Sequence, residues 1–349
     1  MGIKLGIIGY GGMASWHRNN AIRVPGVEVI AAYDIDPARV EAAKKDGLIG
    51  YSTLNELLSN PDINLVLVAT PNNIHKQMVI AALNAGKNAI SEKPVTLTVK
   101  DLDEMIECSV KNGKIFTVHQ NRRWDHDYKV AKEVFDSGIL GKVYTVQSRL
   151  FGSGGIVHGW RAIPEYGGGM VFDWGVHFLD QLLNMIPGKI TSINADLHSV
   201  KNPEIDDYFN IMLKFDSGVT AITELGTFLL KDKPRWYIGG NAGTMVINDF
   251  NGANGSITKV SKLAEFIPPV IVQTSAGPTR TFAPQPPETK EETALPVVKA
   301  DWVEYYANVR DVIDGKADLI VKPAQVRRVL QVIEKVFESY KKGQSVSFE

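Results

Sequence analysis

An aspartate, a histidine and a second aspartate follow three consecutive glycines within residues 167–180. If residues 170–184 form a helix, Asp173 and His177 share one face and Asp180 continues it, because side chains four residues apart are neighbours on a helix. The other residues of this helix are mostly apolar, so we expect it to be buried, and buried charges need partners. The pattern therefore predicts that the side chains on this helix face, a polar stripe, either take part in catalysis or ligand binding, or form a structural pair.

Three interpretations of the stripe are open. Asp173 orients His177 for general acid–base catalysis, the stripe binds a metal ion, or the two side chains form a structural pair. The single cysteine, Cys108, excludes an intramolecular disulfide and a multi-cysteine zinc site. No further ligand is evident, so we favour acid–base chemistry and predict no metal site. The three glycines suit a backbone that approaches a flat ligand closely.

A lysine lies at the end of a predicted strand, in Glu92-Lys93-Pro94. Pro94 biases Lys93 away from helical geometry and permits a cis peptide bond. A lysine held near a cofactor and partly desolvated can have a lowered pKa and act on a substrate oxygen. The alternative is an exposed lysine ahead of a helix, and spacing alone does not separate the two.

A glycine-rich turn, Gly9-x-Gly11-x-x-Ala14, follows the first apolar run of the chain. Such a turn lets a pyrophosphate reach the backbone at a helix N-terminus. Asp34 ends the next predicted strand, 20 positions after Ala14, where a carboxylate binds the ribose 2′-hydroxyl of a dinucleotide. That carboxylate would repel a 2′-phosphate, which favours NAD over NADP, although Arg39 lies near in the sequence.

These residues need a scaffold, and strands alternate with helices from the N-terminus to about residue 121. This alternation predicts a doubly wound, mostly parallel α/β sheet in a domain of residues 1–121. The expected strands are 5–8, 27–33, 65–69, 88–91 and 115–119, and the expected helices are 14–24, 37–46, 53–58, 74–85 and 99–112. Ligands bind beyond the carboxyl ends of such strands, where the glycine turn, residues 70–75 and Lys93 fall.

The pattern then changes to one of successive strands. Short turns at residues 216–218 and 239–243 predict an α+β domain of residues 122–349 with an open, mostly antiparallel sheet. The expected strands are 142–150, 190–197, 207–215, 219–228, 235–239 and 244–248, and the expected helices are 125–137, 170–184, 302–313 and 323–341. Residues 268–296 contain seven prolines and are expected to form an extended surface loop.

Bulk composition excludes several classes of function. The 349 residues carry 38 basic and 39 acidic side chains, so no net charge attracts the chain to nucleic acid or anionic lipid. No apolar run is long enough to span a membrane, and the first strand begins too early to leave room for a signal peptide. We therefore expect a cytoplasmic protein that binds neither nucleic acid nor membranes.

Together these motifs resemble the glucose–fructose oxidoreductase, inositol dehydrogenase and rhizopine-catabolism family, abbreviated Gfo/Idh/MocA. The matching marks are the glycine turn with Asp34, Thr70-Pro71-Asn72-x-x-His75, Glu92-Lys93-Pro94, Asn121-Arg122-Arg123, and Gly167-Gly168-Gly169-x-x-x-Asp173-x-Gly175-x-His177-x-x-Asp180. Glu-Lys-Pro with Asp-x-Gly-x-His is specific for the family and not for any one substrate.

The resemblance implies a Rossmann domain, a nicotinamide cofactor, and oxidation or reduction at a carbon of a sugar, cyclitol or related polyol. It implies that His177 takes the hydroxyl proton, that Asp173 holds the imidazole and favours its charged form, and that Lys93 stabilises the developing alkoxide. It also implies an open sheet that often serves as an oligomer interface, so we expect a homodimer or homotetramer.

We predict three sets of site residues. Contacts to NAD, with NADP as the second choice, are expected from Gly9, Tyr10, Gly11, Gly12, Met13, Ala14, Asp34, Thr70, Pro71, Asn72, His75, Glu92, Lys93, Gln120, Trp160 and Arg161. Contacts to substrate are expected from Lys93, Arg123, Tyr166, Asp173 and His177, of which Lys93, Asp173 and His177 are catalytic. Trp160 suits the packing of an aromatic anchor equally well.

The leading expectation is an NAD(P)-dependent sugar or polyol dehydrogenase or reductase. A glycoside hydrolase that uses bound NAD in a transient oxidation would share these motifs. A non-catalytic nucleotide-sensing regulator would usually lack Lys93 or His177, and both are present here.

Overall fold

A six-stranded parallel sheet forms the N-terminal domain, in the order β3-β2-β1-β4-β5-β6. The computed structural model describes residues 2–152, 158–262, 270–280 and 286–348. The strands of this sheet are β1 (Ile3–Ile8), β2 (Val27–Tyr33), β3 (Ile49–Tyr51), β4 (Leu65–Val68), β5 (Asn88–Ser91) and β6 (Phe116–Val118). Its helices are α1 (Gly12–Ala21), α2 (Pro37–Lys45), α3 (Leu54–Ser59), α4 (His75–Asn84) and α5 (Val99–Asn112).

This arrangement confirms the predicted doubly wound sheet. The central strands are apolar on both faces, and all four residues of β4 are buried. The edge strand β3 is an addition to the prediction, because three residues are too few to give a periodic signal. Strand order reverses between β1 and β4, so the crevice beyond their carboxyl ends is where a ligand of this fold binds.

A nine-stranded sheet forms the C-terminal domain, in the order β16-β13-β12-β11-β7-β10-β9-β8-β17. Among its described strands, only β7 and β10 pair in parallel, so the predicted mostly antiparallel sheet is confirmed. Its strands are β7 (Val143–Phe151), β8 (Ile190–His198), β9 (Tyr208–Phe215), β10 (Thr220–Gly226), β11 (Trp236–Gly240), β12 (Gly243–Ile247), β13 (Gly255–Val260), β16 (Lys290–Thr293) and β17 (Val346–Ser347).

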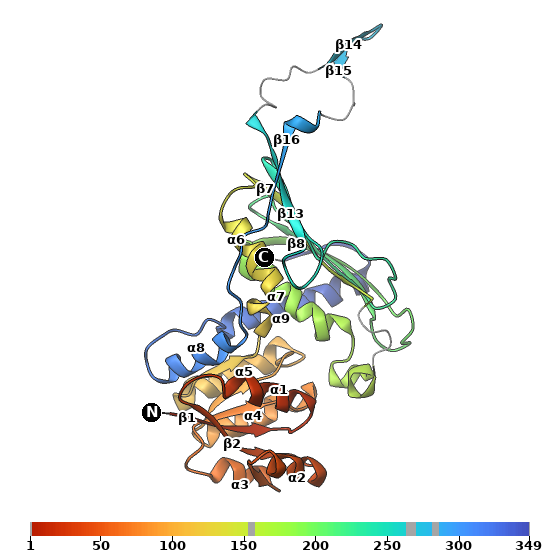
Figure 1. The fold of residues 1–349 in the computed structure, drawn as a ribbon. Helices are drawn as coiled ribbons and strands as arrows, with labels where there is room; N and C mark the ends of the chain where they lie inside the picture. Colours follow the sequence, from red (N-terminus) through yellow and green to blue (C-terminus); the bar gives the residue numbers. More distant parts are fainter. Residues whose placement is uncertain (1, 153–157, 263–269, 281–285, 349) are drawn as a thin grey trace.

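The described helices of this domain are α6 (His126–Asp136), α7 (Val176–Met185), α8 (Val303–Ile313) and α9 (Pro323–Lys342), of which α8 and α9 contact the first domain. Helix α9 packs against α7 and β8 in its own domain and against α5 and β6 in the other, while α8 packs against α1. Figure 1 shows α8 and α9 between the red-to-orange N-terminal domain and the second sheet. The two domains therefore share a packed interface that flanks the ligand crevice.

The expectation of a plain extended loop over residues 268–296 is wrong for the part that the structure describes. Strands β14 (Ile271–Thr274) and β15 (Gly277–Arg280) form a two-stranded hairpin, and β16 pairs with β13. The hairpin has β-branched residues and a glycine with φ of 110° at its turn, a signal that the prolines obscured. Among the described helices, none is both long and apolar enough to cross a membrane.

Candidate active site

The turn between β1 and α1 has the geometry that a bound pyrophosphate needs. Gly9 has φ of 89°, and a Cβ there would lie 2.8 Å from the carbonyl oxygen of Ala69, so only glycine fits. At Gly11 and Gly12 no described atom lies within 4 Å of an added Cβ, so the backbone at the start of α1 is accessible. Because helix N-termini attract anions, this turn fits the phosphates of a dinucleotide.

The side chains around this turn contribute less than its backbone. Tyr10 is buried and its hydroxyl donates to Asp46 (2.6 Å), and Ala14 packs in the core, which leaves Met13 partly exposed beside the turn. Asp34 accepts the Tyr10 N–H through Oδ2 (2.6 Å) and the Asp36 N–H through Oδ1 (2.9 Å). Asp34 therefore lies at the end of β2, as predicted, and borders a small hollow of about 100 Å³ that Arg39 does not line.

Lys93 and Asp173 form the central contact of the site. The Lys93 Nζ donates to the carbonyl oxygen (2.8 Å) and to Oδ1 (2.9 Å) of Asp173, across the domain boundary. Arg161 lies 3.6 Å from the same carboxylate oxygen. Burial alone would raise the pKa of Asp173, but Lys93 and Arg161 together hold that pKa below its usual value. The peptide bond between Lys93 and Pro94 is cis.

His177 is buried in α7 and its Nδ1 has no hydrogen-bond partner among the described residues. Burial, together with the positive charges of Lys93 and Arg122, holds the pKa of His177 well below its ordinary value. The expectation that Asp173 holds this imidazole and favours its charged form is wrong, because the Asp173 carboxylate is paired with Lys93 instead. A neutral imidazole is suited to accept a proton.

A π-helical turn, η5 (Val171–Gly175), explains why the spacing argument failed. The expected helix begins at this turn, so the simple i, i+4 relation between Asp173 and His177 does not hold. Asp206 fixes the turn: its carboxylate accepts the N–H of Val171 (2.7 Å), and its carbonyl oxygen accepts the N–H of Met170 (2.9 Å).

Close contacts with the protein's own atoms explain the glycines ahead of this turn, while their approach to a flat ligand stays a prediction. A Cβ at Gly168 would lie 2.6 Å from the carbonyl oxygen of Arg161, and one at Gly169 would lie 2.3 Å from Asp206 Oδ1. Trp160 and Arg161 stack on each other within η3 (Gly159–Ala162), with 4.2 Å from the guanidinium carbon to the ring centre. Tyr166 is exposed in η4 (Pro164–Tyr166).

A buried cluster that the sequence did not reveal supports Lys93. Glu92 Oε1 lies 2.8 Å from His17 Nε2 and 2.8 Å from His119 Nδ1, and Tyr306 lies 2.6 Å from His17 Nδ1. Glu92 Oε2 accepts the backbone N–H of Lys93 (3.0 Å). Burial would raise the pKa of Glu92, but the two histidines hold it well below its usual value, while burial lowers the pKa of His119 to about 4.

This cluster is the group of described residues whose ligand atoms lie close enough together to suit a metal ion. Its spacings are those of hydrogen bonds, because both histidines approach the same carboxylate oxygen. Glu92 is therefore occupied by its protein partners. No spacing rule connects His17, Glu92, His119 and Tyr306, because they lie in four separate parts of the chain.

The loop after β4 is tied to its neighbours. His75 lies 2.9 Å from the Pro94 carbonyl oxygen and 2.8 Å from that of Thr70, so it joins two loops inside the protein. Pro71 precedes η1 (Asn72–Ile74), and the Asn72 amide donates to the Gly167 carbonyl (3.3 Å). These bonds position the loop, and a direct cofactor contact from His75 lacks support because its ring is fully buried.

Buried polar atoms at the same edge, without partners in the described part of the chain, fit a polar ligand. Both side-chain polar atoms of Gln120, Thr70 Oγ1 and His177 Nδ1 are buried and lack hydrogen-bond partners among the described residues. Buried polar groups are normally hydrogen-bonded, so each of these atoms could form a hydrogen bond with a ligand. The residues present therefore fit a bound nicotinamide nucleotide with a hydroxylated substrate.

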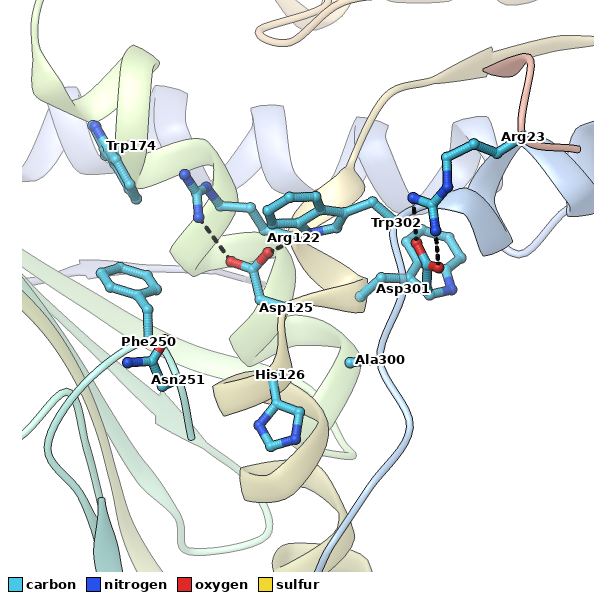
Figure 2. A pocket seen from close by; sticks show the side chains of 11 residues that line it. Arg23, Arg122, Asp125, His126, Trp174, Phe250, Asn251, Ala300, Asp301 and Trp302 are labelled. Carbon is cyan, nitrogen blue, oxygen red and sulfur yellow. Dashed lines mark hydrogen bonds and ion pairs between the residues drawn. The ribbon is translucent and has the colours of Figure 1, made fainter. Parts of the chain in front are cut away.

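The two arginines after β6 have different environments. Arg123 is 5% exposed, donates to both carboxylate oxygens of Asp180 (2.7 and 2.6 Å) and also bonds Ile320 and Gln325. A substrate contact from Arg123 is therefore not supported, because its guanidinium is already paired. Arg122 instead lines a cleft of about 620 Å³ between the domains, which Figure 2 shows.

A Rossmann domain joined to an open-sheet domain, with a lysine and a histidine at their junction, defines a two-domain nucleotide-dependent oxidoreductase. Residues 3–120 match the family model described as "Oxidoreductase family, NAD-binding Rossmann fold", and residues 128–246 match the "GFO/IDH/MocA C-terminal domain". The chain belongs to the Gfo/Idh/MocA family of NAD-binding oxidoreductases, as the resemblance implied.

Two of the following three similar proteins match nearly the whole chain, and the third matches about half of it. A scyllo-inositol 2-dehydrogenase (NADP(+)) of Bacillus subtilis is 27% identical over 99% of this chain and 96% of its own length. An inositol 2-dehydrogenase of Salmonella agona is 34% identical over 48% of this chain and 49% of its own. The crystal structure of an NAD-binding protein from Listeria innocua is 37% identical, with a TM-score of 0.92 and 99% of each chain covered.

Proposed function

We propose that the protein transfers a hydride between NAD(P) and a secondary alcohol or ketone carbon of a sugar, cyclitol or polyol. The observation that carries the proposal is the Lys93 ammonium after β5, close enough to the buried imidazole of His177 to help keep that imidazole neutral. The amide of Gln120, which lies after β6 in the same sheet, has no partner among the described residues. The named activities of the inositol dehydrogenase relatives support the same substrate class.

Each protein group has a defined task in this reaction. A bound nicotinamide supplies the hydride acceptor. The imidazole of His177 accepts the hydroxyl proton, since burial keeps it neutral and ready to do so. The Lys93 Nζ donates a hydrogen bond to the same oxygen as negative charge develops, and Asp173 and Glu92 fix the position of Lys93.

The test is a panel of sugars, inositols and polyols, each mixed with NAD or NADP and followed by the absorbance of the reduced nicotinamide. We expect stoichiometric reduction with at least one polyol. Glycoside cleavage without net reduction of added NAD would indicate the hydrolase alternative, and no turnover with tight NAD binding would indicate a sensor.

A further inference from the structure

The residues that line the cleft between the domains differ in kind from those around Lys93 and His177. Its walls carry the aromatic side chains of Trp174, Phe250 and Trp302, and its volume of about 620 Å³ lies within the range of about 300–1,000 Å³ typical of pockets that bury a whole small molecule. In Figure 2, Trp174 and Phe250 lie on one side of the cleft and Trp302 on the other. Neither Lys93 nor His177 lines it.

The cleft nevertheless begins next to the catalytic residues. Trp174 follows Asp173 directly in the π-helical turn, and its ring centre lies 6.2 Å from that of His177. Arg122 lies with its guanidinium carbon 4.1 Å from the Trp174 ring centre, and its positive charge contributes to the lowered pKa of His177. The cleft therefore lies within reach of a group attached to a substrate at His177.

The charged side chains of the cleft are held in place by hydrogen bonds to one another and to Trp302. Asp125 accepts from Arg122 (2.8 Å) and from the indole N–H of Trp302 (2.8 Å). Asp301 accepts two hydrogen bonds from Arg23 (3.2 and 2.6 Å). Preorganised side chains of this kind bind a ligand without a further ordering cost.

The charges of these groups cancel. Two arginines face two aspartates, so the cleft offers no net attraction for a phosphate or a carboxylate. Aromatic surfaces beside fixed carboxylates and guanidinium groups suit a ligand with apolar C–H faces and hydroxyl edges. An uncharged sugar ring has both features, whereas a nucleotide sugar brings a diphosphate that this lining does not neutralise.

We propose that this cleft binds an uncharged glycosyl group attached to the sugar or cyclitol ring that reacts at His177. The preferred substrate is then a glycoside or disaccharide and not the free monosaccharide. This inference rests on the proposed dehydrogenase function and adds the substrate's second ring to it.

The test combines binding with turnover. Phe250→Ala removes one aromatic wall, and Tyr340→Ala, on the half-exposed surface of α9, is the matched control. Binding of maltose, cellobiose and lactose is followed by quenching of tryptophan fluorescence with NADH present, so that no oxidation occurs. Turnover is compared between each disaccharide and its monosaccharides.

We expect disaccharides to exceed monosaccharides in kcat/KM, and Phe250→Ala to lower that value about tenfold for disaccharides through KM, with monosaccharides and the control unchanged. Equal losses for both sugar classes, or no quenching by any disaccharide, would overturn the proposal. If only free polyols are turned over, the proposed dehydrogenase function stands and the cleft does not bind a glycosyl group. If disaccharides bind, Phe250→Ala weakens that binding, and no sugar is turned over, the cleft proposal stands and the proposed dehydrogenase function is wrong.

Discussion

At the scale of single residues, we expect Lys93 and His177 to carry out the proposed chemistry and other groups to position them. Replacing either by alanine should lower kcat at least tenfold, since general acid–base groups contribute about 10²–10⁴-fold. NAD affinity, measured by calorimetry, should change little because neither side chain holds the nucleotide phosphates. His198→Ala, on an exposed strand end, is the control. Unchanged kcat in both variants would reject the assigned roles.

We expect the charge of Asp34 to set the preference for NAD over NADP. Its carboxylate is fixed by two backbone N–H groups, at the position where it can bind ribose hydroxyls and repel a 2′-phosphate. Asp34→Ala should therefore weaken NAD by tenfold or more and leave NADP nearly unaffected. The dissociation constants of both nucleotides, measured by nicotinamide fluorescence, decide the matter. An equal loss for the two would count against this role.

At the scale of elements, local sequence motifs located individual site residues correctly, but they did not reveal contacts between distant parts of the chain. The glycine turn, Asp34 and Lys93 stand at strand ends that short apolar runs reveal. Asp173 was assigned to the wrong partner because a π-helical turn and a lysine from another strand lie outside any spacing rule. The contact between His17 and Tyr306 spans 289 positions, so no local pattern announces it.

The protonation of Asp206, which holds the π-helical turn, should make the free energy of unfolding depend on pH. Burial raises the pKa of Asp206 to about 6, more than its backbone hydrogen bonds lower it. The folded protein thus holds this proton more tightly than the unfolded chain, where the pKa is ordinary. Its contribution to the free energy of unfolding is therefore complete at low pH, declines between pH of about 4 and 6, and is lost above that. Two pKa units correspond to about 3 kcal/mol.

Asp206→Asn keeps an oxygen for the Val171 N–H and removes the titration. Between pH of about 4 and 7, we expect the variant to lose about 3 kcal/mol less unfolding free energy than the wild type. Urea denaturation at several pH values measures the difference. Parallel pH profiles for the two proteins would show that this carboxyl does not titrate abnormally.

At the scale of the whole molecule, the second sheet leaves one face available for a second copy of the chain. On β9 the residues facing α7 and α9, such as Phe209 and Ile211, are fully buried. The alternate residues are only partly buried in the described chain, and among them Met212 pairs across strands with Ile222. An apolar pair at the centre of a largely uncovered sheet suits a self-complementary contact.

We therefore expect a homodimer or homotetramer that assembles through this face. Ile222→Asp should produce monomers at micromolar concentration, because a charge buried at such a contact lacks a partner. Tyr340→Asp, exposed on α9, should leave assembly intact. Light scattering after size-exclusion chromatography measures both. Because the glycine turn and Asp34 lie in the N-terminal domain and not on this sheet, the monomeric variant should keep NAD binding. An assembled Ile222→Asp protein would place the interface elsewhere.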